Sequence, residues 1–124
     1  MDPRIQIALK IVEEGKASIR MSLTETSRIL GLSETHLLRL FHRDVGKTFR
    51  RYLRDMRMFR AAEMVRQSTL SIKQIALDCG YSDVSNFYRD FKGVNGITPR
   101  QVRFRELTAR AIASHANMDN RRSL

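Results

Sequence analysis

The chain has few of the residues that build disulfide frameworks, membrane spans or secretion signals. It contains one cysteine, Cys79, so no disulfide can form within the chain, which fits a reducing cytosol. No apolar run approaches the roughly 20 residues that a transmembrane helix needs. The first residues, MDPRIQIALKIVEEGK, lack the apolar centre of a signal peptide. The sequence therefore predicts a soluble, intracellular protein.

Acidic residues are scarce beside basic ones. There are 13 Asp and Glu against 23 Lys and Arg, a formal net charge of +10 and a pI of about 10.8. A domain this basic favours polyanions, with nucleic acid first and an anionic membrane surface second. A basic protein that is merely soluble is the plain alternative.

Signatures of enzymes and metal sites are also lacking. The sequence has no Gly-x-Ser-x-Gly elbow, phosphate-cradling loop or paired carboxylate arrangement, so no enzyme is expected. His36, His42 and Cys79 do not have the spacing of a zinc motif, and Cys79 fits a small core residue. We expect no metal and no cofactor.

Helical periodicity runs through nearly the whole chain, and we find no convincing strand. Residues 3–15 read as a first helix with an apolar stripe at Ile5, Ala8, Leu9 and Val12. The segment GKASIRMS reads as a loop. A pair of short helices follows, in which Leu23, Ser27 and Leu30 share a face, Ser33 caps the second helix and Gly46 ends it.

A longer linker helix is predicted over residues 48–67. Its apolar stripe comprises Phe49, Tyr52, Leu53, Met56 and Phe59. A second pair of short helices follows, with Ser71 and Ser82 as expected N-caps. A last helix runs from Pro99 to about Ser114, and residues 117–124 form a polar tail that frays.

The two helix pairs are copies of one unit. Three pairs of positions match at an offset of 49: Leu23/Ile72, Ser27/Ala76 and Gly31/Gly80. Five more match at an offset of 50: Leu37/Phe87, Arg39/Arg89, Phe41/Phe91, Gly46/Gly96 and Thr48/Thr98. One residue has therefore been inserted near the start of the second copy's second helix.

Two short helices joined by a glycine turn describe a helix-turn-helix, in which the second helix fits a major groove. An ordinary helical hairpin is the alternative, but two such units in a chain this basic favour DNA binding. In the second unit we expect an inward face of Ile75, Ala76, Cys79, Tyr81, Phe87 and Phe91, and an outward face of Ser85, Tyr88 and Arg89.

The segments GLSETHLLRLFHRDVGKTFRRYLRDMRMFRAAEMV and SIKQIALDCGYSDVSNFYRDFKGVNGITPRQVR strongly resemble the AraC/XylS family of bacterial transcription regulators. The resemblance covers roughly residues 20–105, and its pattern IA…GYSD…F…FK…G.TP..(V/Y)R is highly specific. It implies an all-α fold of about seven helices in one domain over residues 1–116. Two helix-turn-helix lobes, at about 20–47 and 71–105, are bridged by the helix at 48–67.

The resemblance also implies which residues touch DNA. Recognition helices near 33–44 and 82–92 would enter adjacent major grooves one helical turn apart, on an asymmetric site of roughly 20 bp. The implied base-reading residues are Thr35, Leu38, Arg39, Val84, Ser85, Tyr88 and Arg89. Arginine can donate two hydrogen bonds to guanine, and threonine or leucine can contact the thymine methyl. A phosphate clamp or a solvated arginine is the alternative for Arg39, and a sugar or phosphate contact is the alternative for Tyr88.

Phosphate contacts supply most of the affinity of such a protein. The expected phosphate-contacting residues are Ser33, His36, Arg43, Thr48, Ser82, Lys92, Thr98 and Arg100. Solvated surface charge is the plain alternative for each basic one.

The expected function is sequence-specific transcription regulation in the bacterial cytoplasm, at the nucleoid. Activation through RNA polymerase is the commoner outcome in the family, although the residues do not distinguish an activator from a repressor. A sequence-tolerant architectural DNA-binding protein is the rival interpretation. We expect no small-molecule effector in this chain, no membrane partner, and a monomer if the chain stands alone.

Overall fold

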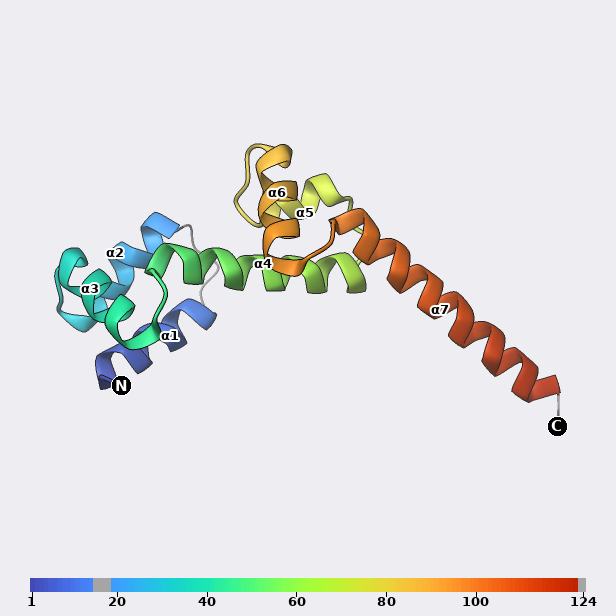
Figure 1. Ribbon diagram of the computed structural model, residues 1–124, viewed down its shortest axis with the longest axis horizontal. Helices are drawn as coiled ribbons and strands as arrows, with labels where there is room; N and C mark the ends of the chain where they lie inside the picture. The colour runs from blue at the N-terminus through green and yellow to red at the C-terminus, as the bar shows by residue number, and fades with distance from the viewer. Residues whose placement is uncertain (15–18, 123–124) are drawn as a thin grey trace. The chain divides into compact units, whose positions relative to one another are not determined.

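The computed structural model describes residues 1–14 and 19–122, without side chains at 19–22 and 118–122. These residues form seven α-helices and no strand, as the periodicity predicted (Figure 1). The helices are α1 (Pro3–Glu14), α2 (Ile19–Leu30), α3 (Glu34–Val45), α4 (Phe49–Gln67), α5 (Ile72–Asp78), α6 (Val84–Asn95) and α7 (Pro99–Arg122). The chain divides into unit 1, Met1–Arg57, and unit 2, Met58–Leu124, and α4 contributes to both.

Unit 1 is built around two aromatic residues that meet where α3 and α4 join. Phe41 and Phe49 are almost completely buried, and their rings meet edge to face with centroids 5.1 Å apart. Ile5, Ala8 and Val12 close this core from α1, which confirms the predicted stripe. Burying one such aromatic or aliphatic side chain stabilises the fold by about 1.5–3 kcal/mol.

Unit 2 repeats this arrangement with its own core. The predicted inward residues Ile75, Ala76, Phe87 and Phe91 are fully buried. Cys79 and Tyr81 are half-buried and pack against the same cluster. The Tyr81 hydroxyl lies 2.6 Å from the Asp90 carboxylate, to which it donates a hydrogen bond, so its polar end is satisfied.

The turns confirm the repeat. Gly31 and Gly80 have φ of 66° and 90°, in the left-handed region that glycine adopts without strain. The amide that follows each glycine donates to the carbonyl five residues earlier, with both N–O distances at 3.0 Å: Leu32 to Ser27 and Tyr81 to Ala76. The offset of 49 therefore holds through Tyr81, and the inserted residue lies between there and the start of α6.

Two predicted helix boundaries were wrong. Part of the predicted loop GKASIRMS belongs to α2, which begins at Ile19, while residues 15–18 lie outside the described residues. No glycine or proline falls between Ile19 and Leu30 to stop this helix. The last helix does not end near Ser114 but runs to Arg122. No glycine or proline follows Pro99, and residues 109–116 are rich in alanine, the best helix former.

The stripe predicted for α4 is correct only in its first part. Phe49 and Leu53 are buried in the core of unit 1, and Tyr52 packs against it. Phe59, the last member of the predicted stripe, is 53% exposed. The register of buried positions changes because the remaining part of α4 serves the core of unit 2 through Met58, Ala61, Ala62 and Val65.

Candidate nucleic-acid interface

Helix α3 separates its residues into a core side and a solvent side. Its N-cap is Ser33, whose Oγ accepts from the His36 amide at 3.1 Å, and Gly46 ends it with φ of 80°. Leu37, Leu40 and Phe41 face the core. The three predicted base-reading residues, Thr35, Leu38 and Arg39, are all exposed.

Helix α6 has the same division, with one correction to its start. Its N-cap is Asp83, whose carboxylate accepts from the Ser85 amide at 2.8 Å, so the predicted cap Ser82 is wrong. The inserted residue shifts the cap by one position. The predicted base readers Ser85 and Arg89 are exposed, whereas Val84 is half-buried.

Tyr88 was expected to face outward, but it is half-buried. It packs against the core of unit 2, and its ring centroid lies 6.3 Å from that of Phe87. Tyr88 therefore supports the position of α6 as well as lining its outer surface.

A groove lies beside α3 in unit 1. Groove 1 has a volume of about 880 Å³ and is lined by Leu23, Leu38, Arg39, His42, Thr48, Phe49 and Arg50. Neither Arg39 nor Arg50 has a hydrogen-bond or ion-pair partner among the described residues. The groove thus combines an apolar floor with two arginines that an anion can engage.

Unit 2 has a smaller groove at the equivalent place. Groove 2 has a volume of about 510 Å³ and is lined by Ile72, Lys73, Val84, Tyr88, Thr98 and Arg100. Four of these match groove 1 at the offsets of the repeat: Leu23/Ile72, Leu38/Tyr88, Thr48/Thr98 and Arg50/Arg100. The repeat has therefore preserved a concave surface as well as a core.

The helix that follows α3 and the helix that follows α6 each start beside a groove, and both have the same cap. Thr48 Oγ1 accepts from the Arg51 amide and Thr98 Oγ1 from the Gln101 amide, both at 3.2 Å. The side chains of these two predicted phosphate contacts are thus used as caps. The first turns of α4 and α7 still present the positive ends of their helix dipoles, which favour a bound phosphate.

The other predicted phosphate residues lie on and next to α3, α6 and the start of α7. Ser82, Lys92 and Arg100 are exposed, and His36 is half-buried. Ser33 is exposed, but its hydroxyl serves as the cap of α3. Lys92 lies in the last turn of α6.

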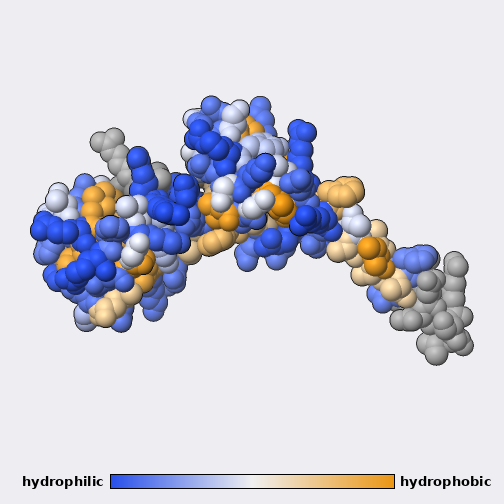
Figure 2. Space-filling view, viewed as in Figure 1, coloured by the Kyte–Doolittle hydropathy of each residue, from blue (hydrophilic) through white to orange (hydrophobic). Residues whose placement is uncertain are grey.

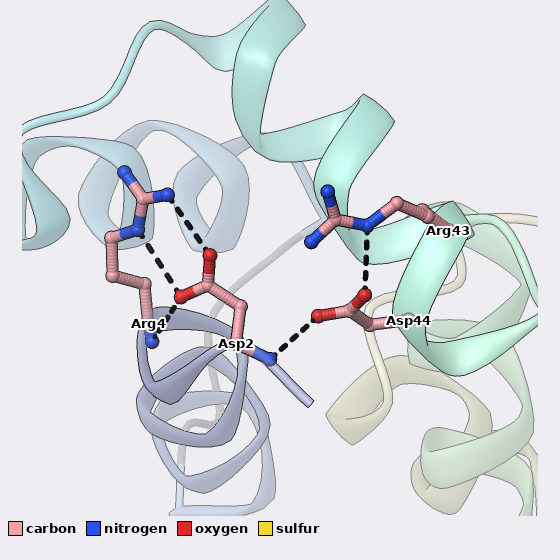
Figure 3. Close-up of polar contacts among 4 residues, drawn as sticks. All are labelled: Asp2, Arg4, Arg43 and Asp44. Atoms are coloured by element: carbon pink, nitrogen blue, oxygen red, sulfur yellow. Dashed lines mark hydrogen bonds and ion pairs between the residues drawn. The ribbon is translucent and has the colours of Figure 1, made fainter.

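Arg43 is engaged within the protein, in a small polar network at the end of α3 (Figure 3). Its Nε lies 2.9 Å from Asp44 Oδ1, and the Asp2 amide donates to Asp44 Oδ2 at 2.8 Å. The Arg43 side chain, followed by the Asp2 amide, lowers the pKa of Asp44. The hydrogen bond from the Arg4 side chain lowers the pKa of Asp2 to about 2. The network ties the start of α1 to the end of α3.

Sequence reasoning missed two basic residues that line the grooves, Arg50 and Lys73. Arg50 could have been found, because Arg100 was predicted and the two match at an offset of 50. For Lys73 no such signal exists, since its counterpart at the offset of 49 is Thr24.

No group of three or more His, Cys, Asp and Glu in the described residues is arranged to hold a metal ion. Likewise, no helix among the described residues has the length and apolar content to cross a membrane.

The chain is similar in sequence to known proteins. A model of the family described as "Helix-turn-helix domain" matches residues 26–105. The transcriptional regulator GlxA of Rhizobium meliloti is 34% identical over 99 residues, which cover 78% of this chain and 31% of that protein. The transcriptional activator RhaR of Cronobacter sakazakii is 38% identical over 69 residues, 56% of this chain and 24% of that protein. The chain thus spans less than a third of the length of either relative.

A solved structure matches the fold over most of its length. The crystal structure of a transcriptional regulator with an AraC-type DNA-binding domain, from Chromobacterium violaceum, aligns with a TM-score of 0.73 and 28% identity. The alignment covers 84% of this chain and 92% of that one.

Proposed function

The chain belongs to the AraC-type helix-turn-helix family of bacterial transcription regulators, and we propose that it reads two adjacent major-groove half-sites on double-stranded DNA. The observation that carries this proposal is the repeated groove. Each unit places a concave, basic surface between its recognition helix and the first turn of the next helix. A protein that bound DNA by charge alone would not need this arrangement twice.

Base reading is assigned to the outer faces of α3 and α6. Arg39 is exposed and has no partner among the described residues, so its guanidinium can donate two hydrogen bonds to a guanine edge. Arg89 occupies the same repeat position, and its Nε lies a loose 3.8 Å from Asp90. Thr35 and Leu38 offer methyl groups to thymine, while Val84, Ser85 and Tyr88 complete the second reading face.

Phosphate binding is assigned to the grooves and helix ends. The first turns of α4 and α7, which begin after Thr48 and Thr98, would each take one phosphate beside Arg50 or Arg100. Ser33, His36, Arg43, Ser82 and Lys92 flank the recognition helices and would contact the backbone on either side. These contacts position the protein without reading sequence.

The proposed role is activation of transcription through contact with RNA polymerase, in the bacterial cytoplasm and at the nucleoid. It is supported by the name of RhaR, a relative described as a transcriptional activator. We assign no effector, cofactor or enzymatic activity to this chain.

The decisive experiment is selection of bound sequences from random duplex DNA at about 0.15 M salt, where non-specific binding is weak. We expect a motif of two half-sites about 34 Å apart, which is one helical turn. Enrichment of no motif, or only of flexible or A·T-rich DNA, would favour the architectural alternative and overturn the proposal.

Single substitutions then separate base contacts from phosphate contacts. Arg39→Ala and Arg89→Ala should each cost about 1–3 kcal/mol on the selected site and relax preference at one base pair. Arg50→Ala should weaken all duplexes alike and reduce the slope of log K against log salt by about 1. Arg28, an exposed arginine paired with Glu25 on α2, provides the matched control in Arg28→Ala.

A further inference from the structure

The two units differ in charge where their paired helices meet. Junction 1 consists of Thr24 on α2 and Glu34, the first residue of α3. The repeat offsets of 49 and 50 place Lys73 and Val84 at the same positions in unit 2, and both line groove 2. Junction 2, formed by Lys73 and Val84, therefore carries a positive charge where junction 1 carries a negative one.

Junction 1 is exposed, and one hydrogen bond restrains its carboxylate. Thr24 and Glu34 are both exposed, and Thr24 Oγ1 donates to Glu34 Oε1 at 3.0 Å. The second carboxylate oxygen, Oε2, has no hydrogen bond or ion pair among the residues whose side chains the structure describes. Since a carboxylate accepts through both oxygens, Glu34 combines a restrained orientation with an acceptor that another molecule can use.

Glu34 lies beside the residues to which base reading is assigned. At about 100° per residue, Glu34, Leu38, Thr35 and Arg39 fall within an arc of about 140° on α3. Leu38 is one helical turn further along and lines groove 1. Figure 2 shows hydrophilic side chains over most of the visible face of unit 1, so the sign of the charge, and not polarity, distinguishes Glu34 from its surroundings.

A carboxylate in this place has few partners on DNA. It repels phosphates, and it repels the acceptor atoms that guanine and thymine present in the major groove. The partners that remain are the amino groups of cytosine and adenine. Adenine carries the N7 acceptor beside its amino group, whereas cytosine offers only the N4 amino group, so cytosine suits a carboxylate best.

We propose that Glu34 reads cytosine at one base pair of the half-site of unit 1, with Thr24 as the positioning residue that holds its carboxylate. This inference rests on the proposed function, in which the first residues of α3 face base edges. Lys73 at junction 2 contacts a phosphate instead. Glu34 precedes Arg39 by five residues, or about 7.5 Å along the helix axis. At about 3.4 Å per base step, the cytosine lies about two base pairs from the pair that Arg39 contacts.

Selection from random duplex DNA, run in parallel on the wild type, Glu34→Gln and Glu34→Ala, tests the proposal. The wild type should prefer cytosine at this pair by about 5–20-fold, the low end of what one side-chain contact provides. Glu34→Gln should shift that preference toward adenine, which glutamine binds through N6 and N7. Glu34→Ala should abolish it. The preferences at the other base pairs should stay as they are.

A general charge effect gives a different result. If Glu34 only repelled phosphates, both substitutions would raise affinity for every duplex alike and leave the selected motif unchanged. Glu63→Gln makes the same change of charge at an exposed residue of α4 that is not among those lining either groove, so as a control it should leave the motif unchanged. An unchanged motif for Glu34→Ala overturns the inference while the proposed function stands. A wild type that selects no motif overturns both.

Two further positions test the positioning role and the difference between the junctions. Thr24→Val removes the hydroxyl and should reduce the cytosine preference at least twofold, and Thr24→Ser should restore it. Lys73→Ala should weaken all duplexes alike and reduce the slope of log K against log salt by about 1. Full cytosine preference in Thr24→Val would overturn the positioning role of Thr24. A changed motif in Lys73→Ala would overturn the phosphate contact of Lys73.

Discussion

Replacing Arg103 by alanine removes the side chain that fastens α7 to the end of α4. The guanidinium makes three hydrogen bonds to main-chain carbonyls, of which those to Val65 and Ser68 are partly buried and that to Leu70 is exposed. An intramolecular hydrogen bond contributes about 1 kcal/mol net to stability. The contribution is larger when the donor is charged and smaller when the bond is exposed to water. The sum is about 2–3 kcal/mol. We expect unit 2 of Arg103→Ala to be less stable by that amount.

The assay is urea and thermal unfolding followed by far-ultraviolet circular dichroism, because the chain has no tryptophan. For a unit of this size, each kcal/mol moves the thermal midpoint by about 4–8 °C, so the loss should be about 10 °C or more. Arg103→Lys keeps the charge but cannot match the planar fork, and should recover only part of the stability. Arg105→Ala, on the exposed side of the same helix, is the control and should lie within about 0.5 kcal/mol of the wild type. If Arg103→Ala unfolds like Arg105→Ala, the three bonds do not fasten the helix and the reasoning is wrong.

Three further predictions concern stability. Thr26 is fully buried, and its hydroxyl has no hydrogen-bond partner among the described residues, so Thr26→Val should raise the free energy of unfolding by about 1 kcal/mol in urea titration. Gly96→Ala should lower the free energy of unfolding by about 1–2 kcal/mol, because φ at Gly96 is +83°. Gly93 lies inside α6 with open space around it, so Gly93→Ala should raise the free energy of unfolding by about 0.5–1 kcal/mol in the same titration. Equal effects of the two substitutions would contradict the backbone argument. Because the folded pKa of Asp44 is lowered, its contribution is present above the unfolded value of about 3.9 and is lost as pH falls through the folded value. Asp44→Asn should therefore flatten the loss of stability below about pH 4, and an unchanged pH profile would refute the role of its contacts with Arg43 and Asp2.

The repeat made the fold readable from the sequence. Each unit has two glycines with left-handed φ, and the two units share buried apolar pairs such as Leu37/Phe87 and Phe41/Phe91. These are local requirements that a chain must satisfy wherever it forms this unit. Each was therefore visible as a residue type at a fixed spacing. The N-cap at Asp83 was missed because the inserted residue breaks this fixed spacing just before α6 begins.

Features that depend on tertiary context were harder to predict. Periodicity shows that α4 has an apolar stripe, but it cannot show that Phe59 lies past the point where the helix passes from one core to the other. The grooves are assembled from three helices each, so only the repeat could have indicated Arg50.

The two separate cores have a consequence for how such a protein can change. The residues that hold α3 in place, Leu37, Leu40 and Phe41, alternate with the exposed residues Thr35, Leu38 and Arg39, which contribute little to folding. Substitutions on that outer face are close to neutral for stability. If each unit reads its own half-site as proposed, substitutions on that outer face can change the base preference of one unit without disturbing the other unit or the fold of either.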